Sequence, residues 1–330
     1  MENKLKIYGT MGPSCHKAED LEAMLKTGMT GLRLNLSHTT LKDAAGWIEQ
    51  WQAAQKSAGL QGDLLIDLQG RELRIGMLDA LELNLNDECI LGRQIPLEKE
   101  ILNELQTGDR LLLDDGKIKV EALEKAEDQV LCKVLQPGIL TSRKSIKIEG
   151  REPNLPALRP QDLSNLQYAR QMGVTGVMVP FVRKADDLKE VNRVLKDMNL
   201  DLRVFAKIEN LEGAGNIDEL MDWCDEIVIA RGDLGNSMPL EQLPWVQHVL
   251  EEKCHQKKHP YMVVTQMLDS MRTNAAATRA EVNDVFWAVY SGADSIMLTG
   301  ETAHGKYPLK AMEFFCSTAR EALKRRQQPD

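Results

Sequence analysis

Two short apolar runs in the second half of the chain end in charged side chains. The first contains Lys207 and reaches Glu209, and the second reaches Arg231 and Asp233. Short runs rich in β-branched residues that end in charge are typical of buried parallel strands whose tips form a surface. Because side chains two positions apart leave a strand on the same face, we expect Lys207 to lie beside Glu209 and Arg231 beside Asp233.

An alternation of strand and helix patterns continues along most of the chain. The candidate strands cover residues 6–8, 31–38, 64–67, 176–181, 204–208, 227–233, 261–267 and 294–301. The candidate helices cover residues 17–26, 41–57, 160–172, 185–198, 216–223, 240–257, 278–290 and 309 to the C-terminal tail. Eight strand–helix units are the number that closes a parallel (β/α)8 TIM barrel. An open doubly wound sheet is the alternative, although the sequence has no dinucleotide-binding GxGxxG motif.

Polar side chains gather where the predicted strands end. They are Asn35, Ser37, Asp67, Lys207, Glu209, Asp233, Thr265 and Glu301. The interior of a TIM barrel is filled by packed side chains, and barrel enzymes carry their active sites at the carboxyl ends of the strands. Two carboxylates beside a lysine would suit a hard divalent cation and phosphoryl-transfer or enolate chemistry. The alternative for each charged pair taken alone is a solvated loop or a local ion pair.

The alternation of strand and helix patterns is interrupted between residues 76 and 151. Short apolar runs separated by turn signals occupy this stretch, and Asp-Gly at positions 115–116 is a hairpin signal. We therefore expect residues 1–75 and 152–330 to form the barrel and residues 76–151 to form a small inserted β-rich lid domain.

Composition narrows the choice of partners and compartment. The net charge is −9, and the one basic cluster, residues 324–326, falls at a helix end, so we expect no nucleic-acid binding. Six cysteines without CxxC spacing indicate free thiols in a reducing compartment. No signal-peptide core and no apolar stretch of about 20 residues is present, so we expect a cytoplasmic protein without membrane contact.

Eleven segments in order along the chain resemble pyruvate kinases. They are residues 10–14 (TMGPS), 33–38 (RLNLSH), 67–74 (DLQGRELR), 114–116 (DDG), 154–157 (NLPA), 181–185 (FVRKA), 207–213 (KIENLEG), 230–235 (ARGDLG), 265–271 (TQMLDSM), 278–281 (TRAE) and 298–302 (LTGET). The resemblance implies a catalytic barrel carrying an inserted β domain as a lid. Members of the family also have a C-terminal regulatory domain; we expect no counterpart of it after the last barrel helix and no effector control through it.

The resemblance also implies a reaction and the residues that perform it. The phosphoryl group of phosphoenolpyruvate would pass to ADP, and protonation of the enolate would give pyruvate and ATP. Glu209 and Asp233 would hold Mg²⁺ or Mn²⁺, while Lys207 and Arg33 would neutralise the phosphoryl group and the enolate oxygen.

Two further parts of the site follow from the resemblance. Backbone N–H groups of Gly232 and Asp233 would bind the substrate carboxylate, and Thr265 would relay a proton to the methylene carbon through water. A monovalent site would use the side chains of Asn35, Ser37 and Asp67 and the carbonyl of Leu68. Glu72 stands where glutamate accompanies potassium dependence in the family, so we expect activation by K⁺.

The nucleotide side departs most from the family pattern. His38, Arg74, Asp115 and Lys144 are the expected nucleotide-binding residues. Family members commonly have Thr, Lys and Pro where this chain has Leu68, Gln69 and Arg71, and a serine where it has Pro180. We expect these differences to affect which acceptor receives the phosphoryl group more than they affect metal binding.

Two other functions remain alternatives. The first is a metal-dependent enolate enzyme, either a lyase or decarboxylase or a specialised phosphotransferase, with altered nucleotide use. The second is a non-catalytic binding or regulatory protein on the same barrel. We expect a homo-oligomer, a dimer through the barrel. For Trp223, Trp245 and Trp287, which lie in or beside helices, we expect ordinary packing in preference to an interface.

Overall fold

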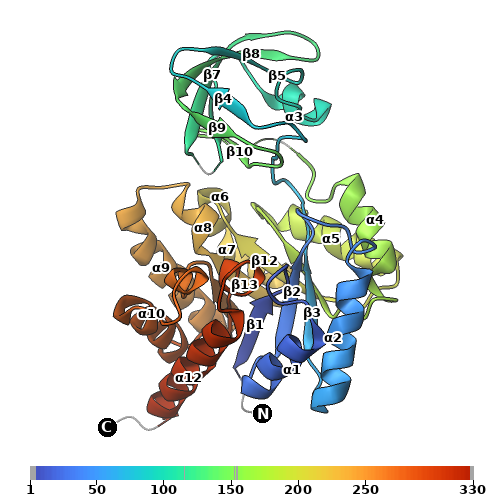
Figure 1. The fold of residues 1–330 in the computed structure, drawn as a ribbon, viewed down its shortest axis with the longest axis vertical. Helices are drawn as coiled ribbons and strands as arrows, with labels where there is room; N and C mark the ends of the chain where they lie inside the picture. The colour runs from blue at the N-terminus through green and yellow to red at the C-terminus, as the bar shows by residue number, and fades with distance from the viewer. Residues whose placement is uncertain (1–4, 115, 152, 154, 328–330) are drawn as a thin grey trace. The chain divides into compact units, whose positions relative to one another are not determined.

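The computed structural model describes residues 5–114, 116–151, 153 and 155–327 of the chain. These residues form two compact units, one comprising Met1–Gly70 with Ala157–Asp330 and the other Arg71–Pro156 (Figure 1). The inserted unit begins before the expected residue 76 because Leu73 and Ile75 are buried in its own hydrophobic core.

The larger unit is a closed barrel of parallel strands, which confirms the predicted (β/α)8 fold. The strands are β1 Lys6–Thr10, β2 Gly31–Asn35, β3 Asp63–Asp67, β11 Gly176–Val179, β12 Arg203–Ile208, β13 Glu226–Ala230, β14 Tyr261–Val264 and β15 Ser295–Met297. Their order around the barrel is β1-β15-β14-β13-β12-β11-β3-β2, with parallel pairing throughout. The carboxyl ends of all eight strands therefore point to the same end of the barrel.

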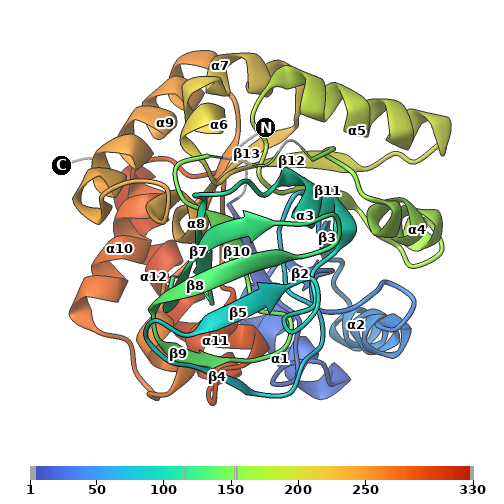
Figure 2. The ribbon, with the colours of Figure 1, turned by 90° about the horizontal axis from the view of Figure 1, so that it is seen from above.

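Helices surround these strands (Figure 2). They are α1 Ala18–Thr27, α2 Ala45–Ala58, α4 Pro160–Ala169, α5 Ala185–Asp197, α6 Leu211–Gly215, α7 Ile217–Leu220, α8 Arg231–Gly235, α9 Leu243–Lys257, α10 Arg279–Tyr290, α11 Gly300–Ala303 and α12 Pro308–Gln327. Local sequence sets their ends: the Thr278 hydroxyl and the Glu281 carboxylate form a capping box at the start of α10. The helix expected from residue 41 begins only at Ala45, after a turn.

Apolar side chains fill the inside of the barrel as well as its outside. The inner cluster contains Tyr8, Leu65, Met178, Phe205, Val228, Ala230, Met262, Val264 and Met297. Two strand glycines make room for its rings, since a Cβ on Gly31 would lie 2.7 Å from Tyr8 and one on Gly176 would lie 2.8 Å from Phe205. This packed interior confines the remaining charged groups to the two ends of the barrel.

A polar cluster, which we call the floor, lies at the amino-terminal ends of the strands. Asp63 accepts hydrogen bonds from Lys6 (3.2 Å), the Tyr8 hydroxyl (2.9 Å) and Arg203 (3.2 Å), and Arg203 also donates to the Tyr8 hydroxyl (3.0 Å). On the neighbouring strands the Ser295 hydroxyl donates to buried Glu226. Burial raises the pKa of Glu226 to about 7. The sequence analysis did not single out this cluster.

The inserted unit is β-rich, with one short helix that the sequence did not predict. Its five-stranded antiparallel sheet has the order β10-β6-β7-β8-β5, and β4 pairs with β9. These strands are β4 Leu81–Leu83, β5 Glu88–Leu91, β6 Arg110–Leu113, β7 Ile118–Lys125, β8 Val130–Gln136, β9 Gly138–Leu140 and β10 Ile146–Ile148. The unexpected helix is α3 Lys99–Glu104, which buries Ile101 and Leu102.

The expectation that three tryptophans would pack against the barrel is wrong. Trp223, Trp245 and Trp287 are 41%, 68% and 50% exposed. Trp287 donates to the Asn283 side chain (3.1 Å), and its ring lies edge-on to the rings of Phe286 and Tyr290, all within its own helix. No helix in the part of the chain that the structure describes is long and apolar enough to cross a membrane.

Candidate active site

Arg33, Asp67 and Lys207 converge from three strands at the carboxyl end of the barrel. The Arg33 guanidinium binds the Asp67 carboxylate at 2.6 and 2.8 Å, and the Lys207 ammonium lies 3.1 and 3.2 Å from the same carboxylate. Burial acts against the charge on Asp67, yet Lys207 and Arg33 hold the pKa of Asp67 below its ordinary value. The carboxylate is therefore ionised and keeps both cations in place.

Glu209 extends this group on the other side of Lys207. Its carboxylate lies 2.9 Å from the Lys207 ammonium and accepts a hydrogen bond from the Phe181 N–H (2.9 Å). The prediction that Lys207 and Glu209 lie side by side is thus confirmed. Burial would lower the pKa of Lys207, but Asp67 and Glu209 raise it above its ordinary value.

Two nearby carboxylates act on Glu209, which is 2% exposed. Burial raises the pKa of Glu209 to about 7; Lys207 opposes this shift, and the charges of Asp233 and Asp67 add to it. Asp233 is half-buried and lies close enough to repel Glu209. A buried carboxylate that is repelled by a second one is an arrangement that a cation would stabilise.

The donor set of Glu209 and Asp233 fits a hard divalent cation. Mg²⁺ prefers oxygen ligands, and proteins commonly supply one or two carboxylates while water and substrate oxygens complete the shell. No cluster of three or more His, Cys, Asp or Glu side chains suited to a metal occurs among the described residues.

The expected side-by-side placement of Arg231 and Asp233 on one strand is wrong. Strand β13 ends at Ala230, and residues 231–235 form the helical turn α8. In a helix, positions two apart point in different directions. Arg231 instead forms a bidentate pair with Asp284 of α10, at 2.7 Å for both contacts.

Gly232 and Thr265 lie against each other where β13 and β14 end. A Cβ on Gly232 would lie 2.9 Å from the Thr265 Cγ2, so only glycine allows this approach. Thr265 and Gln266 have φ angles of +80° and +56°, and β14 ends at Val264 instead of the expected residue 267. The positive φ angles explain why the strand stops there.

The residues of the expected monovalent site lie on adjacent strands or just after them. Asn35 of β2 is in register with Asp67 of β3, and the Asn35 side-chain oxygen accepts a hydrogen bond from the Ser37 N–H (3.0 Å). Leu68 is buried directly after β3, and its N–H donates to the Met178 carbonyl (3.1 Å). These oxygen donors suit a monovalent cation, and their assignment to one stays a prediction.

The expected nucleotide-binding residues are divided between the two units. His38 belongs to the barrel unit, and its N–H donates to the Asn35 carbonyl (3.4 Å). In the inserted unit Arg74 binds the Glu72 carboxylate (2.5 Å) and Lys144 binds Asp114 (2.8 Å). Asp115 lies outside the described residues. The nucleotide assignment therefore stays a prediction.

Two helix residues that sequence reasoning missed hold the loops of this site. Asp162 of α4 is fully buried and accepts hydrogen bonds from the N–H groups of Gln69 (2.9 Å) and Gly70 (3.0 Å), and so fixes the turn after β3. Asp284 of α10 holds Arg231. Both residues lie far in sequence from their partners, so no local pattern could have found them.

Glu301 supports neighbouring loops. It was expected at the strand ends and is buried, where its carboxylate accepts hydrogen bonds from the N–H groups of Leu268 (3.0 Å) and Thr299 (2.9 Å). Both oxygens of Glu301 thus join the segments that follow β14 and β15.

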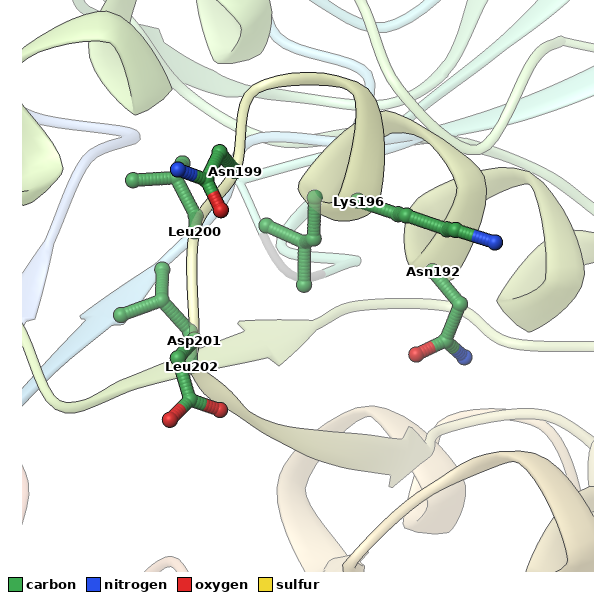
Figure 3. Close-up of a pocket in the computed structure, with 7 residues that line it drawn as sticks. Asn192, Lys196, Asn199, Leu200, Asp201 and Leu202 are labelled. Atoms are coloured by element: carbon green, nitrogen blue, oxygen red, sulfur yellow. The ribbon is translucent and has the colours of Figure 1, made fainter.

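One surface depression lies away from these residues (Figure 3). Its volume is about 350 Å³, and residues at the end of α5 and in the turn before β12 line it, including Lys196, Asn199 and Asp201. This is the opposite end of β12 from Lys207, so the depression is separate from the candidate site.

Comparison with known proteins agrees with the motifs. Residues 2–312 match the family model of the pyruvate kinase barrel domain. The chain is 34% identical to pyruvate kinase from Geobacillus stearothermophilus over 95% of its own length and 56% of that protein. It is 34% identical to the Aeropyrum pernix pyruvate kinase over 98% of its length and 72% of that protein, and 35% identical to the Staphylococcus saprophyticus pyruvate kinase over 94% and 55%. The chain thus spans little more than half of two of these relatives. With the barrel and its rim residues, these matches establish that the chain belongs to the pyruvate kinase family.

Proposed function

We propose that this protein transfers the phosphoryl group of phosphoenolpyruvate to ADP and yields pyruvate and ATP, with Mg²⁺ and K⁺ as cofactors. The observation that carries the proposal is the position of Lys207. Its ammonium lies 3.1 Å from Asp67 and 2.9 Å from Glu209, and Arg33 shares the Asp67 carboxylate. Preorganised cations beside a carboxylate pair are what stabilises a transferring phosphoryl group.

The cationic side chains bind and orient the substrate in this proposal. Arg33 grips the phosphate, because a guanidinium can make two parallel hydrogen bonds to phosphate oxygens. Lys207 neutralises the phosphoryl group in transfer and then the enolate oxygen. Asp67 keeps both cations at fixed positions, so little reorganisation is needed when charge moves.

Glu209 and Asp233 would hold the divalent ion, Mg²⁺ or Mn²⁺. When bound, such an ion supplies positive charge that polarises phosphoryl and enolate oxygens. The N–H groups of Gly232 and Asp233 bind the substrate carboxylate. The Thr265 hydroxyl relays a proton between water and the methylene carbon, because a threonine hydroxyl is too weak an acid to give up its own proton without replacement.

A monovalent cation, K⁺, would take the side-chain oxygens of Asn35, Ser37 and Asp67 and the carbonyl oxygen of Leu68. Glu72 supports K⁺ as the monovalent cation, because in the pyruvate kinase family a glutamate at this position accompanies potassium dependence. We expect His38, Arg74, Asp115 and Lys144 to bind the nucleotide phosphates. We place the enzyme in the cytoplasm and expect a dimer through the barrel.

The altered turn after β3 motivates a second candidate function. Arg71 stands where the family commonly has proline; its side chain is buried and donates to the Leu155 carbonyl (2.5 Å). A metal-dependent enolate enzyme with a different acceptor would retain Lys207, Glu209 and Asp233 and change this turn.

A coupled assay for pyruvate tests the proposal. Purified protein is given phosphoenolpyruvate, ADP, Mg²⁺ and K⁺, and each of the four is omitted in turn. We expect turnover only with the acceptor and Mg²⁺ present, and a marked loss when K⁺ is replaced by tetramethylammonium. Exchange of pyruvate methyl protons without phosphorylation of ADP would favour the enolate enzyme. If neither reaction occurs, a binding or regulatory protein becomes the better interpretation.

A further inference from the structure

Thr265 holds a backbone conformation that its side chain disfavours. Its φ is +80° and that of Gln266 is +56°, and a β-branched residue rarely adopts such an angle. Asn199 and Lys258 also have positive φ, but they follow the ends of α5 and α9, where a left-handed residue is usual. Thr265 follows a strand, so something other than a helix end must hold it.

A single guanidinium holds the Thr265 peptide. Arg231 donates to the Thr265 carbonyl from Nε at 3.2 Å and from Nη2 at 2.8 Å. Nη2 also lies 2.9 Å from the sulfur of buried Met267. Two donors on one carbonyl fix the orientation of the peptide plane that follows Thr265.

Asp284 holds the guanidinium in turn. Its two carboxylate oxygens accept from Nη1 and Nη2 of Arg231, each at 2.7 Å. Asp284 lies on α10, and its side chain is 36% exposed. It is not among the residues that we expect to touch substrate or metal, so any effect it has on the reaction must pass through Arg231.

The side chain of Thr265 is restrained as well. Its Cγ2 packs so closely on Gly232 that a Cβ there would lie 2.9 Å away. Arg231 fixes the carbonyl and the neighbouring Gly232 limits the side chain, so the turn that begins α8 determines where the Thr265 hydroxyl points.

We propose that Arg231, held by Asp284, is a positioning residue that keeps the Thr265 hydroxyl aligned for proton transfer to the enolate carbon. This inference rests on the proposed function. In the step concerned, the Thr265 O–H bond breaks as its proton forms a C–H bond with the methylene carbon, and the hydroxyl recovers a proton from water, which leaves as hydroxide. The C=C electron pair forms the C–H bond, and an electron pair of the enolate oxygen forms the ketone of pyruvate.

Asp284→Asn tests the inference, with the exchange of pyruvate methyl protons in deuterated buffer as the main measurement. We expect exchange to slow at least about tenfold while KM for phosphoenolpyruvate changes less than about twofold. Asp284→Glu, which keeps the charge, should restore part of the exchange. Arg231→Lys should give the same selective loss, because a point charge cannot hold a carboxylate and a carbonyl together.

A double-mutant cycle separates positioning from general damage. In a Thr265→Ala background, Asp284→Asn should cause no further loss of exchange, because no hydroxyl remains to be aligned. The matched control is Asp218→Asn on α7, which removes an exposed ion pair with Lys253 of α9 (2.6 Å) and should leave exchange unchanged.

The outcomes distinguish the two proposals. Wild-type protein without turnover and without exchange would overturn the proposed function. Active wild-type protein with normal exchange in both Asp284→Asn and Arg231→Lys would overturn only the positioning role. An equal loss from Asp284→Asn with and without the Thr265 hydroxyl would do the same. If Asp284→Asn fails to fold, Arg231→Lys and Asp284→Glu still decide the question.

Discussion

The two ends of the barrel carry similar kinds of side chains but differ in the partners of their buried glutamates and in their backbone. The floor combines two carboxylates with two cations and two hydroxyls, namely Asp63, Glu226, Lys6, Arg203, Tyr8 and Ser295. The rim combines three carboxylates with two cations, namely Asp67, Glu209, Asp233, Arg33 and Lys207. The charge of Asp294 also raises the pKa of Glu226, so each end carries one carboxylate more than cations. The two buried glutamates have different partners, since Glu226 accepts from the Ser295 hydroxyl and Glu209 lies 2.9 Å from the Lys207 ammonium. A proton or an added cation stabilises a surplus of this kind.

The backbone conformation distinguishes the two ends more clearly. Next to the floor, positive φ angles occur after helices, at Asn199 and Lys258. At the rim they occur at Phe181, Thr265 and Gln266, which follow strands. Strained backbone that no helix cap explains is typical of functional sites. The comparison thus assigns stability to the floor and chemistry to the rim.

Replacing one lysine at each end tests this division most severely. Lys207→Met should lower kcat at least about a hundredfold, because it removes a preorganised charge from the proposed site of phosphoryl transfer. Lys6→Met removes a half-exposed partner of Asp63 and should leave kcat within about twofold. The coupled pyruvate assay measures both variants. Similar losses from the two substitutions would contradict the division.

Glu226→Gln should change the pH dependence of stability. Glu226 has a pKa of about 7 in the folded protein, above its ordinary value of 4.5. The unfolded chain therefore loses this proton first as pH rises, and the free energy of unfolding should fall between pH 4.5 and 7 by about 3 kcal/mol. In Glu226→Gln the free energy of unfolding should not show this contribution to the fall. Denaturant unfolding at pH 5 and pH 8 measures it, and equal declines in both proteins would contradict the prediction.

Tyr8→Phe should have the smallest effect. It removes the hydroxyl that donates to Asp63 (2.9 Å) and accepts from Arg203 (3.0 Å), while Lys6 and Arg203 still neutralise Asp63. We expect the free energy of unfolding to fall by about 1 kcal/mol, with kcat unchanged. A substantial loss of kcat in a stable Tyr8→Phe protein would show that the floor influences the rim.

Local pattern was enough to predict the barrel and part of its rim. The apolar runs identified the strands, and the two-residue spacing correctly placed Lys207 beside Glu209. The same rule failed for Arg231 and Asp233, because the chain turns into α8 directly after Ala230. Glu209 follows the last residue of β12 directly and still lies beside Lys207, whereas Arg231 and Asp233 both belong to a helical turn. Nothing in the local sequence marks unambiguously where a strand gives way to a helix.

The sequence by itself determined the order of strand and helix, the family motifs and the identity of the rim residues, because these depend on short-range periodicity and residue type. Only the tertiary structure decided which groups that are distant in sequence form hydrogen bonds and ion pairs. The pairing of Asp162 with Gln69 and Gly70, of Asp284 with Arg231, and of Asp63 with Arg203 joins segments that only barrel closure brings together. Their electrostatics depend on distance and burial in three dimensions, which no local pattern encodes.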